Sequence, residues 1–302
     1  MNQNILASFK IILAMTIVGS SVVAGKLLVQ SFPVFLASEL RFLLAVLILL
    51  PLLLYREGFP TLTKKEVVIL FLQSATGVFL FSLCMLYGLK YTTATEGGIL
   101  TSTLPAVVAV IAFFILKERV SKYAMIGILL AVLGTTAVNI SGIFAIDQRG
   151  AAPLLGNMLI LGAVISEALF IILGKSISKK ITPLAISTLV SLFGVILFLP
   201  LALYEAISFD FDQMTFLDWG LILYFGIVVT VVAFVLMYQG LEQVPASTAG
   251  VLTGFLPISS VVLSSLFLKE QILWTHLVGM AFVLLAIYLV SKTESISVTK
   301  NA

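Results

Sequence analysis

Residues 104–120 read LPAVVAVIAFFILKERV, and residues 256–272 read LPISSVVLSSLFLKEQI. A shift of 152 positions places the second stretch on the first without a gap, so that both begin with Leu-Pro and carry Leu-Lys-Glu at the same distance. Each stretch is an apolar run of helical length that ends in a charged turn. This repeated order predicts that the chain contains two copies of one unit.

Further matches extend the duplication outward from these two stretches. The same shift pairs Gly88-Leu89 with Gly240-Leu241. Near the start of each half, Gly25-Lys26 falls on Gly174-Lys175 at a shift of 149. Each half therefore begins with a helix that ends in Gly-Lys and closes with a Pro-containing helix, a Lys-Glu turn and a last helix.

Composition sets the environment of both halves. Of 302 residues, 61% are hydrophobic and 10% are charged, with a mean hydropathy of +1.20. An ordinary soluble domain carries about 25% charged residues, so this composition excludes a soluble enzyme and a nucleic-acid binder and predicts a polytopic membrane protein. The single cysteine (Cys84) and single histidine (His276) exclude a disulfide framework and a His/Cys metal site. We expect no catalytic group, metal or cofactor.

The expected fold is all-α, with ten transmembrane helices. A membrane-spanning helix needs about 20 mainly apolar residues, and ten such stretches can be drawn along the chain. They cover residues 9–29, 33–54, 66–88, 92–116, 121–141, 154–174, 183–204, 217–240, 245–268 and 272–291.

The number of spans in each half decides how the halves relate. We assign residues 1–141 to a first repeat, 142–153 to a connecting outer loop and 154–302 to a second repeat. Because five is an odd number, the second half must enter the membrane in the opposite sense to the first. Inverted repeats of this kind are a transporter architecture, with the substrate site near the membrane midplane.

These residues resemble a known family. Leu104-Pro105 followed by Leu116-Lys117-Glu118-Arg119-Val120, its second copy and the Arg41-Phe42 pair look like two EamA repeats of the drug/metabolite transporter superfamily. The resemblance implies ten helices and export of amino acids, metabolites or drugs. It also implies that spans one to four and six to nine line the pathway, with spans five and ten at the periphery.

Basic residues in the loops predict the orientation. Cytoplasmic loops carry an excess of Lys and Arg. With the N-terminus inside, the outer loops hold Lys90, Arg149 and Lys269, and all other loop and tail cations are cytoplasmic. We therefore expect a multi-pass protein of the cell membrane with both termini in the cytoplasm. Its short loops and tails favour a bacterial inner membrane. The predicted inner cations are Lys10, Arg56, Lys64, Lys65, Lys117, Arg119, Lys122, Lys179, Lys180, Lys292 and Lys300.

Glu167 is the foremost candidate for substrate binding or coupling. An ionisable group within a span costs about 2.5–3.5 kcal/mol on insertion scales, and the repeat equivalent of Glu167 is Val18. A carboxyl placed so deep tends to hold its proton, because burial disfavours the charged form. It either exchanges a proton with substrate or is a hydrogen-bonded glutamate facing another helix, with Ser166 or Asn157 nearby.

Three more ionisable residues lie in the first hairpin. Lys26 and Glu39 are placed symmetrically about its tip and could pair across spans one and two, whereas Arg41 points to a different face from Glu39. One hypothesis is a clamp for a substrate carboxylate, since Arg offers a bidentate fork. The other is a buried ion pair that fixes the hairpin.

The remaining candidates are weaker. Glu96 precedes Gly97-Gly98, a pair that permits an irregular helix start, so Glu96 either lines an outer vestibule or is an ordinary helix-N-terminal acid. Hydrogen bonds in a cavity could also come from Gln73, Tyr87, Ser102, Tyr238 and Gln239.

Features present in both halves point to structure. We expect Lys117-Glu118 and Lys269-Glu270 to form turns in which Glu accepts hydrogen bonds from the free N–H groups of the next helix. Pro105 and Pro257 each remove a backbone hydrogen bond within a span, as a packing kink or as a gating hinge.

The sequence thus predicts a transporter that exports a small metabolite, an amino acid or related amphiphile, by alternating access. The alternatives are a multidrug exporter of hydrophobic cations and a non-transporting scaffold or receptor. The expected partners are a small-molecule substrate and the lipid bilayer, with no nucleic acid. Export is driven either by proton exchange at Glu167 or Glu39, which adds protons to the partners, or by simple downhill movement. Small residues at seven-residue spacing in spans five and ten suit either packing within the monomer or a homodimer.

Overall fold

The structure is a computed structural model. It describes residues 3–104, 106–108, 110–111, 125–126, 129–130, 133–134, 150–177, 181–243, 252, 255–270, 272–282, 284–285 and 288. Pro105, Lys117 and Glu118, for which the sequence predicts a kink and a turn, lie outside these residues, as does most of the predicted loop 142–153. Helical residues occur in each of the ten expected spans, which confirms an all-α polytopic protein.

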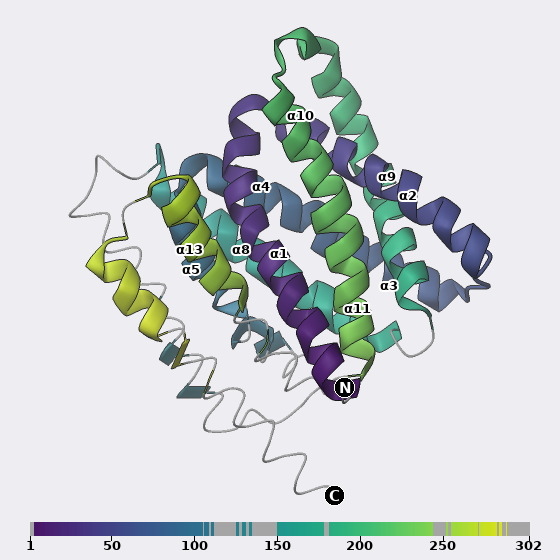
Figure 1. Ribbon diagram of the computed structural model, residues 1–302, viewed down its shortest axis with the longest axis horizontal. Coiled ribbons are helices and arrows are strands. Elements are labelled where there is room, and N and C mark those ends of the chain that lie inside the picture. The colour runs from purple at the N-terminus through teal and green to yellow at the C-terminus, as the bar shows by residue number, and fades with distance from the viewer. Residues whose placement is uncertain are drawn as a thin grey trace, which may run out of the picture.

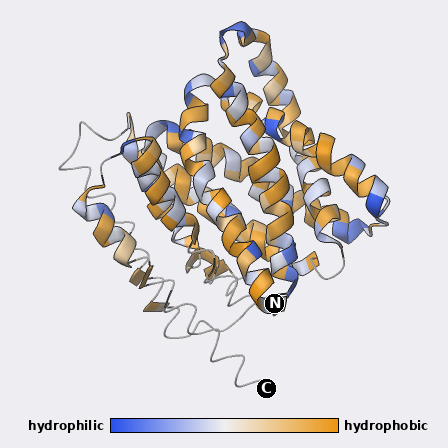
Figure 2. Cartoon of the chain, viewed as in Figure 1, coloured by the Kyte–Doolittle hydropathy of each residue, from blue (hydrophilic) through white to orange (hydrophobic). Residues whose placement is uncertain are grey.

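Six helices in the described part are long and apolar enough to cross a membrane. They are α1 (Gln3–Ser31), α2 (Val34–Arg56), the run α3–η1–α4, α8 (Pro153–Ile177), α9 (Pro183–Ser208) and the run α10–η5–α11. The first run joins α3 (Lys64–Ser74), η1 (Ala75–Leu80) and α4 (Phe81–Tyr91), and the second joins α10 (Phe216–Leu223), η5 (Tyr224–Val232) and α11 (Ala233–Gln243). Shorter helices are α5 (Ala94–Thr101) and α13 (Phe255–Phe267), and η4 (Phe211–Gln213) is a short turn. In Figure 2 apolar residues dominate all of these helices, and hydrophilic residues gather at their ends.

The two halves run in opposite senses. Lys26, near the end of α1, donates a hydrogen bond to the Leu89 carbonyl at the end of α4. Gly156, near the start of α8, lies against the Gly88 carbonyl at that same end. Because α1 ends where α8 begins, the first helices of the two halves are antiparallel. We name the face where α1 begins the N-terminal face, at the bottom of Figure 1, and the other the opposite face.

Equivalent helix contacts recur in the two halves. The α4–α8 contact places Gly88 against Gly156 and Ile160, whereas the α1–α11 contact places Gly240 against Ala7 and Ile11. Gly88 and Gly240 are related by the shift of 152, and the other pairs by the shift of 149. Glycine at both positions allows the backbones to approach closely. The halves therefore share a packing plan as well as a sequence pattern.

Local signals at the helix starts also repeat. Thr63 and Glu66 form a capping box at the start of α3, and Thr215 and Asp218 form one at the start of α10. Thr63 and Thr215 are related by the shift of 152. In each box the side chains satisfy backbone N–H groups that have no partner within the helix. The two boxes begin equivalent helices at opposite faces.

Both of these spans also contain a π-helical segment, η1 in the first half and η5 in the second. The shift of 152 places Ala75–Leu80 within Tyr224–Val232. In η5 the Thr230 hydroxyl donates to the Phe225 carbonyl, 2.8 Å away and five residues earlier. The sequence analysis did not predict these segments, since no residue type marks a π-helix as Pro marks a kink.

Candidate functional site

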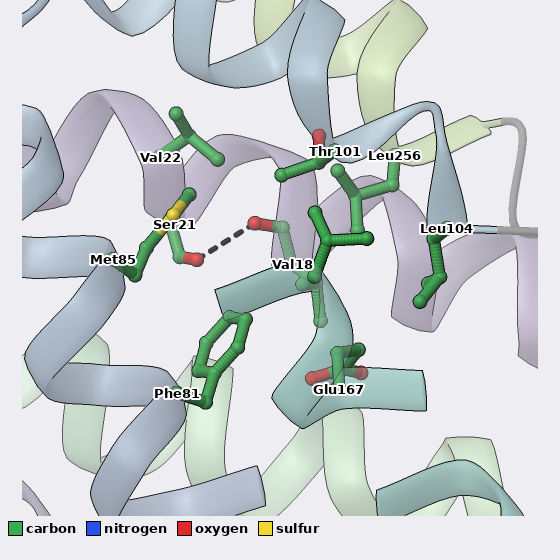
Figure 3. Close-up of a pocket in the computed structure, with 10 residues that line it drawn as sticks. Val18, Ser21, Val22, Phe81, Met85, Thr101, Leu104, Glu167 and Leu256 are labelled. Carbon is green, nitrogen blue, oxygen red and sulfur yellow. Dashed lines mark hydrogen bonds between the residues drawn. The ribbon is translucent and has the colours of Figure 1, made fainter. Parts of the chain in front are cut away.

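A cavity lies within the bundle, between α1, α4, α5, α8 and α13 (Figure 3). It contains about 340 Å³ of space free of protein atoms, a volume that includes open space at its mouth. The walls that the structure describes are mainly apolar, and Glu167 is the one charged residue among them. The lining residues are Val18, Ser21, Val22, Phe81, Met85, Thr101, Leu104, Val164, Glu167 and Leu256.

The cavity lies where the two halves meet. Val18 and Glu167 are repeat equivalents, as are Leu104 and Leu256, and all four line it. A site lined by matching positions of both repeats lies close to the axis that relates them. Glu167 is ten residues from the end of α8 and Val18 is near the middle of α1, so the cavity is deep within the bundle. Substrate sites of inverted-repeat transporters occupy this place.

Glu167 makes no hydrogen bond in the part of the chain that the structure describes. The hydroxyls of Ser166 and Ser21, which were possible partners, donate instead to carbonyls of their own helices. Asn157 donates to Glu96, at 2.7 Å. Neither Ser166 nor Asn157 therefore hydrogen-bonds to Glu167 in this structure, and the carboxyl lines the cavity. Proton exchange between Glu167 and substrate stays a prediction.

Gln73 and Tyr238 come together on the N-terminal side of the cavity. The Gln73 Nε2 atom donates to the Tyr238 hydroxyl at 2.7 Å and to the Phe170 carbonyl at 3.2 Å. Both side chains are fully buried, and Glu167 lies within electrostatic reach of Tyr238. The sequence named both residues separately, and the structure joins them through α3, α8 and α11.

Lys26 belongs to a cluster at the opposite face, which we call the Lys26 cluster: Lys26, Thr92, Thr95, Glu96, Asn157 and Glu270. Lys26 donates to the Leu89 carbonyl at 2.5 Å and to the Thr92 carbonyl, and it interacts electrostatically with Glu270 and Glu96. The expected pair between Lys26 and Glu39 does not form. The physical reason is that α1 packs mainly on α11 and α13, whereas α2 packs mainly on α9 and η5.

Glu270 anchors the same cluster from the second half. Its carboxylate accepts hydrogen bonds from the Ala94 and Thr95 N–H groups, at 2.9 and 2.7 Å. These groups begin α5, so the expected type of bond forms, but not with the expected next helix. Lys269 adopts a left-handed φ of 53° in the turn after α13, as a tight reversal requires.

Glu96 is also part of this cluster. Its carboxylate accepts hydrogen bonds from the Thr92 hydroxyl at 2.8 Å and from the Asn157 amide at 2.7 Å, and it is buried. Together these bonds tie α4, α5 and α8 at one end. A glutamate held in this way suits the structural alternative better than an open vestibule.

Arg41 and Glu39 are buried on α2 and do not line the cavity. The Arg41 Nη2 atom donates to the Ser82 hydroxyl at 2.8 Å, and its guanidinium lies 4.3 Å from the ring centre of Phe42. The Arg41 Nε atom and the Glu39 Oε2 atom have no hydrogen-bond partner among the described residues. Neutral and aromatic groups therefore hold Arg41, and the carboxylate clamp stays a prediction.

The remaining candidates lie apart from the cavity. Tyr87 packs edge-on against Phe35, the Ser102 hydroxyl donates to the Ile99 carbonyl, and the Gln239 side chain accepts a 2.8 Å hydrogen bond from Lys10. Pro257 is buried in the first turn of the described α13. Hinge motion at Pro257 stays a prediction.

Other polar contacts were not anticipated. Glu205, near the end of α9, accepts a 2.8 Å hydrogen bond from the Leu36 N–H at the start of α2. At the other end of this helix pair, Glu57 accepts one from the Thr182 hydroxyl, the N-cap of α9. Sequence could suggest that these acids bind a helix N-terminus, because acids stabilise helix N-termini. It could not suggest which helix, because the packing of α2 against α9 is decided by the tertiary structure. Among the described residues no three His, Cys, Asp or Glu side chains gather as metal ligands.

The chain is similar to known proteins over most of its length. A model described as the EamA-like transporter family matches residues 5–140 and 154–292. The chain is 54% identical over 276 residues to a Bacillus subtilis (strain 168) protein named uncharacterized transporter YetK, covering 91% of this chain and 83% of that one. It is 25% identical over 293 residues to the uncharacterized transporter YoaV of the same organism, covering 94% and 96%. A solved crystal structure at 14% identity matches with a TM-score of 0.64 over 94% of this chain and 95% of that one, which supports the fold alone.

Proposed function

The chain belongs to the EamA-like transporter family, and on this premise we propose that it exports a small amphiphilic metabolite, such as an amino acid or a related amine. The protein is a multi-pass membrane transporter and not an enzyme. One observation carries the proposal: a carboxyl group without a hydrogen-bond partner among the described residues faces a cavity between the two halves. Substrate and proton would compete for that carboxyl.

The position of Glu167 supports this role. A charged group deep in a membrane protein is costly, and it is tolerated where it serves a pathway or a proton relay. Ionised Glu167 would attract the ammonium group of a substrate, and apolar walls such as Phe81 and Met85 would hold its carbon skeleton. Protonation of Glu167 would release the substrate, so that export is driven by proton entry.

The two halves supply the movement. In alternating access, one repeat rocks against the other around a fixed central site. The Lys26 cluster ties α1, α4, α5, α8 and α13 at the opposite face, through side chains that bond helix ends rather than substrate. This supports assignment of the cluster to the closed outer side of the pathway.

The basic residues support one orientation of the bundle in the membrane. With Lys and Arg counted as cytoplasmic, the N-terminal face of the bundle is the cytoplasmic one, and both termini are inside. The bacterial relatives are consistent with residence in a bacterial cell membrane. The opposite face, with the Lys26 cluster, would then face outward.

A second candidate is multidrug export of hydrophobic cations. It is favoured by the cavity walls, which are mainly apolar and place no basic residue beside Glu167. A hydrophobic cation needs an acid and an apolar surface, whereas an amino acid also needs a partner for its carboxylate. The two candidates therefore differ in the group opposite the amine.

The test is counterflow in proteoliposomes with labelled amino acids, amines and lipophilic cations, each run with wild type and Glu167→Gln. We expect saturable exchange of one amine-bearing class, reduced at least about tenfold in the variant, a loss of roughly 1.4 kcal/mol. Exchange of lipophilic cations alone would favour the second candidate. Undiminished exchange in Glu167→Gln would overturn the role of Glu167.

A further inference from the structure

Two equivalent three-residue contacts lie on either side of the cavity. On the N-terminal side, Gly174 lies against Gln73 and Tyr238; on the opposite side, Gly25 lies against Phe225 and Leu86. Gly25 matches Gly174 at the shift of 149, and the shift of 152 relates Gln73 to Phe225 and Leu86 to Tyr238. The fold thus builds the same contact twice, once polar and once apolar.

The polar contact leaves one hydrogen available. The Tyr238 hydroxyl oxygen accepts a hydrogen bond from Gln73, whose Nε2 atom also donates to the Phe170 carbonyl. The hydroxyl of Tyr238, which is 2% exposed, therefore keeps its own hydrogen for another acceptor. A buried hydroxyl without an acceptor is costly, so the surroundings of Tyr238 should supply one.

Glu167 lies on the α8 face that the Tyr238 ring contacts, although its carboxyl, which lines the cavity, does not hydrogen-bond to Tyr238 in this structure. Glu167, Phe170 and Gly174 follow at spacings of three and four on α8, so they share one face of that helix. The Tyr238 ring lies along this face, 6.1 Å from the Phe170 ring centre and against Gly174. Glu167, one turn earlier, lies within electrostatic reach of Tyr238.

We propose that Tyr238, held by Gln73, is a positioning residue that donates a hydrogen bond to ionised Glu167 when this carboxyl turns from the cavity toward the N-terminal face. The proposal deepens the proposed function and rests on it for its role in transport. Ionised Glu167 is stabilised on the side where substrate enters. On the opposite side, Leu86 and Phe225 offer no donor, so the carboxyl turned that way would carry a proton.

The groups around Glu167 leave Tyr238 as the main influence on its titration. Among the described residues, the titratable groups that face α8 near Glu167 are Tyr238 of α11 and the Cys84 thiol of α4, which lies against Gly162. The described lining from α1, α5 and α13 is uncharged. The Lys26 cluster meets α8 at Asn157, ten residues or about 15 Å from Glu167.

The test is a titration of the Glu167 carboxyl by infrared difference spectroscopy of the purified protein, with Glu167→Gln identifying its band. In Tyr238→Phe the charged carboxylate loses a donor, and we expect its pH midpoint to rise by about one to two pH units. Tyr224→Phe is the matched control, because that hydroxyl hydrogen-bonds to Ser20 on α1 instead. We expect the control to titrate like wild type.

A second variant guards against misfolding of the first. Gln73→Met leaves the hydroxyl in place but unanchored, and should raise the midpoint by about half a pH unit. An unchanged midpoint in folded Tyr238→Phe overturns the proposal. The titration needs no transport, so absence of counterflow in wild type would refute the proposed function without deciding this one. In counterflow, the pH profile of Tyr238→Phe should move by the same amount.

Discussion

The two halves of this protein follow one plan and differ at one point of chemistry. Around the cavity the first half presents Val18, with Leu86 beside Gly25, where the second half presents Glu167 and Tyr238. The helix contacts at these positions are otherwise equivalent. The comparison teaches that the repeat maintains the frame, and that departures from the repeat mark the side chains available for transport.

Features that occur in both halves cap helices or allow helices to pack closely. The capping boxes at Thr63 and Thr215 begin equivalent helices, and Gly88 and Gly240 admit equivalent helix contacts. None of these four residues lines the cavity. Substitutions can therefore test whether a residue belongs to the shared frame or to the asymmetric centre.

The largest effect is expected from moving the carboxyl to the other half. Glu167→Val should reduce counterflow at least about tenfold, equivalent to roughly 1.4 kcal/mol. Adding Val18→Glu places a carboxyl in the same cavity, because both positions line it, and we expect recovery to within about threefold of wild type. The restored exchange should have its pH midpoint displaced upward, since the contact at Gly25 has Leu86 and Phe225 where the contact at Gly174 has Tyr238 and Gln73.

The control for this exchange is Val18→Glu alone, which puts two carboxyls in one cavity. Two like charges in one site disfavour ionisation of both, so the control should bind an additional proton. The swapped variant is compared with Glu167→Val once both are shown to be folded to the same extent. If counterflow is then not recovered, a carboxyl at position 18 cannot replace one at position 167.

A smaller effect, on stability, is expected at Lys26. Lys26→Met removes the donor to the Leu89 and Thr92 carbonyls and the electrostatic interaction of Lys26 with Glu270 and Glu96. We expect a loss of about 3 kcal/mol in the free energy of unfolding, measured by denaturant titration in detergent. Lys10→Met is the control, because within the described part of the chain Lys10 donates to one neutral partner, Gln239, and should lose less than about 1 kcal/mol. Equal losses would refute the structural role of the Lys26 cluster.

The smallest effect concerns the two capping boxes. Thr63→Ala and Thr215→Ala each remove the side chain that accepts from the third N–H of its helix, at 3.4 and 3.3 Å. Each should cost about 1 kcal/mol, and the double variant should lose the sum, since the boxes lie at opposite faces and share no partner. The same denaturant titration measures all three. A clear difference between the single variants would show that the halves are less alike at their helix starts than their geometry implies.

Some site residues can be predicted from the sequence alone, because the prediction only requires a comparison of equivalent positions in the two halves. Glu167 stands out by its place in an apolar stretch and by its departure from Val18. It lines the cavity, and its role in transport stays a prediction. The hairpin made Lys26 and Glu39 candidates to pair at similar depth, whereas in the structure Lys26 donates to carbonyls at the end of α4. A hairpin tip fixes the depth of its two helices, and it does not fix whether they stay side by side.

Glu270 shows the same limit from another direction. Its position after a helix predicted bonds to free helix N–H groups, and such bonds form. The helix that receives them is α5, 175 and 176 residues away along the chain. Local chemistry predicted the kind of partner, and the packing of α13 on α5 decided which one.

The sequence by itself determined the all-α membrane fold, the ten spans, the duplication and the inverted relation of the halves. Those properties depend on hydropathy, span length and an odd number of spans, all of which are local or countable. Only the tertiary structure decided that Val18 and Glu167 share a cavity, that Gln73 holds Tyr238, and that Lys26 bonds α4 instead of Glu39. These contacts join helices far apart in the chain, and helix packing selects them through side-chain shape and close backbone approach, which no periodicity in one helix encodes.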